Sequence, residues 1–158
     1  MNIRKLTQSD KAQMLTLMEE FWMKHHRQQL LSGEIKDIAE LKNPSEQMKI
    51  ELEQYFSMYT YVAEQDGKLL GFVVGQITTE PDRILDKIGY IEELFVTENA
   101  RGLKLGQSLM EKILEVLKTE GCTVYRTSAY VNNTVAINLY RKFGFIDDSL
   151  ELSRKVNK

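Results

Sequence analysis

The feature that most constrains this chain lies in residues 90–118, where a strand pattern runs through a short turn into a helical pattern. Apolar residues that favour strands come before the turn: Ile91, Leu94, Phe95 and Val96. After the turn, apolar residues recur every four positions, which is helical spacing: Leu105, Leu109, Ile113 and Leu117. The sequence therefore predicts a buried strand that leads directly into an amphipathic helix.

The turn itself, residues 101–106, reads Arg-Gly-Leu-Lys-Leu-Gly. Glycine lets the backbone approach a ligand closely, and the first turn of a helix has unpaired N–H groups that favour negative charge. Such a turn is typical of a phosphate or diphosphate site. A packing turn with a solvated Arg101 and Lys104 has the same residues, so spacing alone leaves both interpretations open. The P-loop and Gly-x-Gly-x-x-Gly patterns are absent.

The length and composition limit the classes of function. The 158 residues suit one domain over residues 1–158, with enough chain to bury a core. The net charge of −2 disfavours nucleic acid as the main partner, because binding it needs a concentrated basic face. The single cysteine, Cys122, suits a reducing cytoplasm. We expect no metal site, transmembrane helix or signal peptide, because the sequence lacks the spacing or apolar run that each requires.

The rest of the chain alternates between helical and strand patterns. In order, we expect a strand over 2–6, a helix after residue 10, a helix from residue 45, strands over 59–64 and 69–77, the central strand and helix, a strand over 123–129, a short helix after residue 132, and a terminal strand or hairpin over 145–155. Residues 27–44 have no decisive pattern and fit either a substrate-selecting lid or a simple connection. This order predicts a mixed α/β domain.

Two motifs within this framework resemble the GNAT family of N-acetyltransferases. The family's loop pattern, Gln/Arg-x-x-Gly-x-Gly/Ala, is matched by Arg101 and Gly106, with Lys104 where the family usually has glycine. The pattern Asn-x-x-Ala-x-x-x-Tyr followed by Gly-Phe is matched by Asn133, Ala136, Tyr140, Gly144 and Phe145. The resemblance implies a mixed, mostly antiparallel sheet flanked by helices, and acetyl transfer from acetyl-CoA to a primary amine.

The resemblance also implies where acetyl-CoA binds, without any metal. The diphosphate would lie on the loop made of Arg101, Gly102, Leu103, Lys104, Leu105, Gly106 and Gln107. The pantetheine arm would pair in the manner of a β-strand with Leu94, Phe95 and Val96, where a bulge and splaying from residues 125–130 open the sheet. The N–H near Leu94 would polarise the thioester carbonyl. The second motif completes the contacts with Asn133, Ala136 and Tyr140, and Asn133 also suits a helix cap.

Catalysis requires groups that carry protons. Tyr140 occupies the family's general-acid position, although a tyrosine on this helix stripe also fits a core role. Glu92 and Glu93 lie on the central strand, where a carboxylate is unexpected unless it is paired or functional. We favour Glu92 over Glu93 as the base that deprotonates the amine; a salt-bridged pair at the surface is the alternative.

The sequence therefore predicts an N-acetyltransferase that works by direct attack in a ternary complex, with a catalytically silent acyl-CoA-binding module as the alternative. Acidic and aromatic residues suggest a cationic acceptor: Glu19, Glu20, Trp22, Glu34 and Asp37. By themselves, the polar residues of the first helix, His25 among them, are expected on a solvated face. A homodimer is expected only by analogy with family members, and neither nucleic acid nor membrane is expected as a partner.

Overall fold

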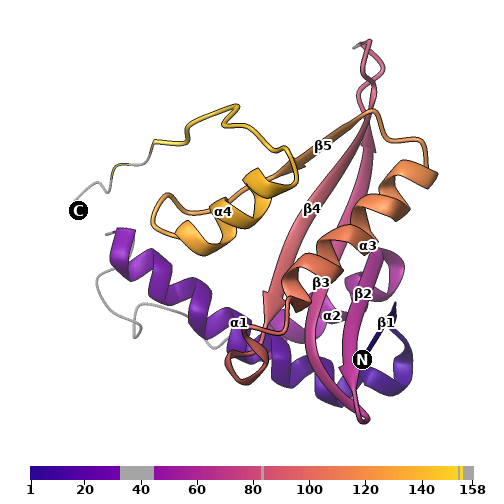
Figure 1. The fold of residues 1–158 in the computed structure, drawn as a ribbon, viewed down its shortest axis with the longest axis vertical. Helices are drawn as coiled ribbons and strands as arrows, with labels where there is room; N and C mark the ends of the chain where they lie inside the picture. The colour runs from indigo at the N-terminus through magenta and orange to yellow at the C-terminus, as the bar shows by residue number, and fades with distance from the viewer. Residues whose placement is uncertain (33–44, 83, 153, 155–158) are drawn as a thin grey trace.

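The computed structural model describes residues 1–32, 45–82, 84–152 and 154. Its described residues form one sheet in the order β1-β2-β3-β4-β5, with helices on both faces (Figure 1). The strands are β1 (Asn2–Lys5), β2 (Tyr59–Gln65), β3 (Lys68–Thr79), β4 (Lys87–Val96) and β5 (Val124–Thr127). The α-helices are α1 (Lys11–Ser32), α2 (Ser45–Ser57), α3 (Leu105–Thr119) and α4 (Thr134–Lys142). All pairings are antiparallel except that of β4 with β5, which confirms the expected mixed, mostly antiparallel sheet.

Each face of the sheet has its own hydrophobic core, because side chains alternate along a strand. On β3, Phe72 and Val74 pack beneath α1 and α2, whereas Val73 packs beneath α3. The four residues that predicted the central helix are all buried in the second core: Leu105, Leu109, Ile113 and Leu117. This packing fixes α3 against the sheet, so the turn that precedes α3 is held at the end of β4.

The expected terminal strand over residues 145–155 is wrong. Residues 145–152 and 154, the part of this segment that the structure describes, contain no strand. Their apolar side chains are largely exposed: Ile146 and Leu152 are both 84% exposed, and Leu150 is 69% exposed. A segment with the residue pattern of a strand forms a strand only when it pairs with the edge of a sheet and buries one face in a core. No partner strand for this segment is present among the described residues.

Two other expectations concern the N-terminal half and the membrane. α1 continues to Ser32, beyond the point where the helical pattern becomes unclear. The rest of the expected lid or connection, residues 33–44, lies outside the described residues, as do Glu34 and Asp37. Of the helices that the structure does describe, none has the length and apolarity needed to cross a membrane.

Gly71 on β3 provides a test of how β3 and β4 are packed. A Cβ at this position would come within 2.5 Å of the carbonyl oxygen of Phe95, and backbone cannot move aside cheaply. We expect Gly71→Ala to lower the free energy of unfolding by about 1–3 kcal/mol in urea denaturation. The matched control is Gly106→Ala in α3, where the nearest contact is an ordinary 3.4 Å to Leu139 Cδ2. This control should raise the free energy of unfolding by about 0.5–1 kcal/mol; equal effects of the two substitutions would contradict the packing.

Candidate active site

The sheet opens where β4 loses β5 as its neighbour. The two strands pair from Ile88 opposite Val124 to Ile91 opposite Thr127, and no further β4 residue is paired with β5. At this last pair, the Thr127 hydroxyl donates a hydrogen bond of 3.0 Å to the Ile91 carbonyl oxygen. Figure 1 shows α4 and the connection after β5 diverging from β4 beyond this point. The expected splaying is therefore present, and the β4 backbone that follows Ile91 is available on that side.

A β-bulge lies at the same place on β4. Val74 of β3 pairs with Glu93 and Gly75 pairs with Ile91, so Glu92 is the extra residue. Beyond the bulge, Leu94 packs toward α3 and Phe95 packs toward α1. The bulge and the end of pairing with β5 together set the second half of β4 apart from the rest of the sheet.

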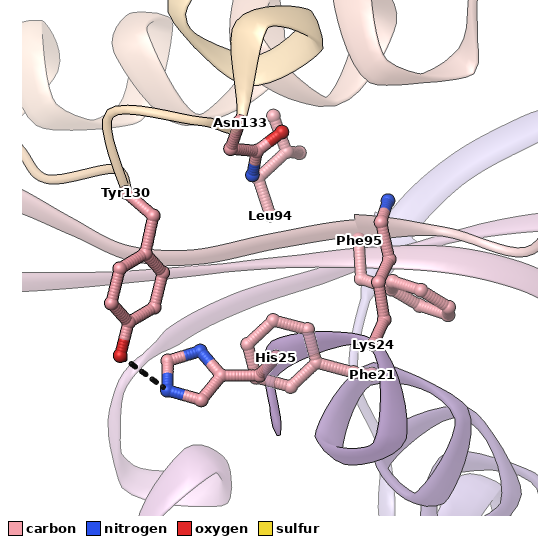
Figure 2. A pocket seen from close by; sticks show the side chains of 7 residues that line it. All are labelled: Phe21, Lys24, His25, Leu94, Phe95, Tyr130 and Asn133. Carbon is pink, nitrogen blue, oxygen red and sulfur yellow. Dashed lines mark hydrogen bonds between the residues drawn. The ribbon is translucent and has the colours of Figure 1, made fainter. Parts of the chain in front are cut away.

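A small cavity opens beside this part of β4 (Figure 2). Three elements supply its lining: Phe21, Lys24 and His25 from α1, Leu94 and Phe95 from β4, and Tyr130 and Asn133 from the connection that leads into α4. The Tyr130 hydroxyl lies 3.5 Å from His25 Nε2, so this contact joins α1 to the connection across the cavity (Figure 2). The structure thus brings together Leu94, Phe95 and Asn133, which the motifs predicted, with residues from α1.

The α1 residues of the cavity were missed or misplaced by sequence reasoning. His25 was expected on a solvated face, but it is partly buried, and its ring lies 5.2 Å from that of Tyr130. One signal in the sequence was available: Phe21 and His25 are one helical turn apart, so an apolar and a polar side chain share one face of the helix. No local pattern says which element that face meets.

Asn133 combines the two roles that its motif allows. Its side-chain oxygen accepts a hydrogen bond of 3.3 Å from the Ala136 N–H, so it caps α4. The same side chain lines the cavity together with Leu94 (Figure 2). The cap holds the start of α4 at the opening of the sheet.

The loop before α3 leads into a helix start that no side chain caps. Lys104 is the N-cap of α3 and adopts a left-handed conformation, with φ 57° and ψ 18°, which glycine would adopt without strain. No side chain caps this end of α3, so the first N–H groups of the helix have no side-chain acceptor. The Arg101 guanidinium donates a hydrogen bond of 2.8 Å to Glu98. The backbone therefore takes the glycine-like shape although lysine occupies the position.

Tyr140 and Glu92 both line a second, larger cleft along β5 and α4. Burial raises the pKa of Tyr140, and a hydrogen bond with the Thr127 side chain partly offsets this rise. A tyrosine with a raised pKa keeps its proton at neutral pH, so Tyr140 can act as a proton donor. Glu92 is exposed in the cleft.

Glu93 is the desolvated carboxylate of the pair. Burial raises the pKa of Glu93 to about 7, and the nearby charges of Glu51 and Glu92 act in the same direction. The Tyr55 hydroxyl opposes this rise in pKa by hydrogen bonding to the carboxyl group. Glu93 Oε2 is buried and has no hydrogen-bond partner among the described residues. Glu92, by contrast, is exposed and lines the same cleft as Tyr140.

Comparisons with known proteins agree with this geometry. A family model described as "Acetyltransferase (GNAT) family" matches residues 17–145. A mycothiol acetyltransferase from Sanguibacter keddieii is 34% identical over 84 residues, which are 53% of this chain and 27% of that protein. An L-2,4-diaminobutyric acid acetyltransferase from Nocardia farcinica is 30% identical over 82 residues, which are 51% of this chain and 40% of that protein. The chain spans less than half the length of these two relatives.

Solved structures share the fold over the whole chain. The structure of AAC(6')-Iy in complex with a bisubstrate analog, CoA-S-monomethyl-acetylneamine, superposes with a TM-score of 0.74 and 16% sequence identity. The match covers 99% of this chain and 98% of that chain. At this identity, the likeness shows the arrangement of helices and strands.

The raised pKa of Glu93 makes stability depend on pH. The folded protein holds this proton more tightly than the unfolded chain does, so stability falls as the pH rises from about 4.5 to about 7. At pH 8, Glu93→Gln should raise the free energy of unfolding by about 2–3 kcal/mol, and near pH 4.5 it should change little. Urea denaturation at both pH values checks this. Glu92→Gln is the matched control, since Glu92 is exposed; the same gain from both variants would contradict the assignment.

The left-handed backbone of Lys104 predicts an unusual response to substitution. Lys104→Gly should raise the free energy of unfolding by about 1 kcal/mol, because glycine adopts this conformation without strain. Lys104→Ala keeps the strain and removes the same charge, so it should not stabilise the protein. Thermal and urea denaturation of both variants provide the comparison, and equal stabilities would show that the loop is not strained.

Proposed function

Because the chain belongs to the acetyltransferase (GNAT) family, we propose that it transfers the acetyl group of acetyl-CoA to a primary amine by direct attack in a ternary complex. The opened sheet is the observation that carries this proposal. The bulge at Glu92 and the end of pairing at Ile91 leave β4 backbone groups available beside the uncapped start of α3. A peptide-like arm that ends in a diphosphate is complementary to this combination.

The cosubstrate contacts follow from this arrangement. We propose that the pantetheine arm pairs with the backbone of Leu94, Phe95 and Val96, and that the Asn133 amide bonds to the arm in the cavity they share. The diphosphate lies on residues 101–107, where N–H groups and the start of α3 favour negative charge. Ala136 and Tyr140 on α4 complete the wall of this site.

The chemistry requires one proton acceptor and one proton donor. Glu93, with a pKa of about 7, accepts a proton from the ammonium of the acceptor at neutral pH, directly or through water. The neutral amine attacks the thioester carbonyl, and the N–H near Leu94 stabilises the negative charge that develops on its oxygen. The C–S bond breaks, and Tyr140 donates its proton to the leaving thiolate. The attacking nitrogen then loses its second proton, which returns Tyr140 to its neutral form, and Glu93 releases the first proton to solvent. The amide and free coenzyme A are the products. Glu93 replaces Glu92 as the proposed base because it is the desolvated carboxylate.

The acceptor that fits best is a cationic primary amine of a small molecule or peptide. The carboxyl groups of Glu51 and Glu92 both act on Glu93, so negative charge gathers around this part of β4. This charge favours an approaching ammonium group. The Nocardia relative is named for a small diamino acid, which supports the same substrate class. We place the reaction in the cytoplasm on the basis of the single cysteine.

The decisive test replaces the proton donor without removing its ring. We expect Tyr140→Phe to lower kcat by about 100-fold, because general acid catalysis contributes roughly 10²–10⁴ to a rate. Its affinity for coenzyme A should stay within about twofold of wild type. Thiol release from acetyl-CoA is followed over a panel of primary amines, and calorimetry measures coenzyme A binding.

Three outcomes separate the hypotheses. Loss of turnover with retained affinity supports catalysis by Tyr140. A wild-type protein that binds coenzyme A but acetylates no amine in the panel would be a catalytically silent acyl-CoA-binding module. A protein that binds no form of coenzyme A would rule out both functions.

A further inference from the structure

Lys24 of α1 is a partly buried cation beside the loop that precedes α3. We infer that Lys24 is a ligand for the phosphates of the cosubstrate, contributed by the helix on the opposite side of the cavity. This inference rests on the proposed function and adds a binding residue that neither sequence motif contains. Three observations support it: a hydrogen bond between α1 and the start of the loop, the charges around Lys24, and the cavity that Lys24 lines.

α1 is tied to the start of the loop one turn before Lys24. The Thr97 hydroxyl donates a hydrogen bond of 2.8 Å to Glu20 Oε2, and Thr97 is only 9% exposed. Residues four apart on a helix share a face, so Lys24 points to the same region as Glu20. The charges that act on Lys24 are those of Arg101 and Glu98, both in the connection between β4 and α3. The hydrogen bond between Thr97 and Glu20 therefore holds the Lys24 amino group near the loop.

The charges around Lys24 are not balanced within the described part of the chain. Lys24 has no hydrogen bond or ion pair there, and Glu98, the nearby carboxylate, is already bonded to Arg101 at 2.8 Å. Burial and the positive charge of Arg101 lower the pKa of Lys24. Lys24 thus feels the positive charge of Arg101, while Glu98 is hydrogen-bonded to Arg101 and forms no ion pair with Lys24. An anion bound beside Lys24 would relieve both the repulsion and the desolvation.

The cavity that Lys24 lines offers space for the cosubstrate that carries the phosphates. The Lys24 Nζ lies 5.7 Å from the centre of the Phe95 ring, and Lys24 lines the cavity with Leu94 and Asn133. In Figure 2 its side chain runs alongside Phe95, with the amino group directed toward the side of the cavity where Leu94 and Asn133 lie. A cosubstrate whose arm follows β4 would carry its phosphates from this cavity to the loop. Lys24 would then bind them from the side opposite Arg101 and Lys104.

The test compares donors with and without phosphates. Lys24→Met keeps the apolar stem and removes the charge; we expect it to raise the KM for acetyl-CoA and the Kd for coenzyme A by about tenfold. The KM for S-acetylpantetheine, which has no phosphate, should change by less than about twofold. Because salt screens the attraction between charges, added salt should weaken coenzyme A binding less in Lys24→Met than in wild type. Lys24→Arg, which keeps the charge, should bind coenzyme A within about threefold of wild type.

Lys112→Met is the matched control. Lys112 also lies over an aromatic ring, 5.5 Å from the centre of Tyr61, but it is paired with Glu115 on α3. This variant should bind both donors as wild type does. Thermal denaturation of all three variants shows that each is folded before binding is compared.

Each remaining outcome has one meaning. If wild type binds coenzyme A and Lys24→Met binds it equally well, the inference is overturned and the proposed function stands. If Lys24→Met weakens both donors equally, Lys24 shapes the cavity and does not bind phosphate, which also overturns the inference. Mass spectrometry that found Lys24 itself acetylated after incubation with acetyl-CoA would place its amine at the thioester and overturn the inference. Failure of wild type to bind coenzyme A would overturn the proposed function as well.

Discussion

The site depends on one constraint: the pairing between β4 and β5 ends partway along β4. A buried backbone N–H or carbonyl group needs a partner, and a strand inside a sheet normally finds one on each side. Here pairing stops after Ile91 and Thr127, and the bulge at Glu92 coincides with that point. α3 packs on the same sheet with its uncapped end at the close of β4. One break in pairing thus leaves β4 backbone groups available near the uncapped start of α3, and the proposed binding of acetyl-CoA depends on this combination.

The site concentrates features that cost stability. Within the described part of the chain, Glu93 has a buried oxygen with no hydrogen-bond partner and Lys24 has a charge with no ion pair, and Lys104 has a left-handed backbone. Some charged groups elsewhere in the described residues are closely paired. Arg4, for example, bonds to Asp10 through both terminal nitrogens, at 2.7 and 2.8 Å, and to Glu64 through Nε at 2.6 Å. Strain and unpaired charge that gather in one place are typical of a functional site.

Much of the framework could be predicted because its signals are local. The spacing of apolar residues in α3 required one buried face, and Asp66-Gly67 supplied the positive φ values, 51° and 76°, that a tight hairpin needs. The loop and the Asn133 cap were recognised from residues adjacent in sequence. The terminal strand failed for the opposite reason. Ile146, Leu150 and Leu152 have the composition of a strand, but a strand forms only with a neighbouring edge.

By itself, the sequence determined the order of strands and helices as far as α4, the loop that opens α3 and the family to which the chain belongs. Periodicity, glycine positions and short motifs are local properties of the chain. Only the tertiary structure decided that Glu93 is desolvated while Glu92 is exposed, and that Lys24 and His25 of α1 face β4 across a cavity. Burial and the meeting of charges depend on which surfaces pack together. That packing joins residues far apart in sequence, so no local pattern contains it.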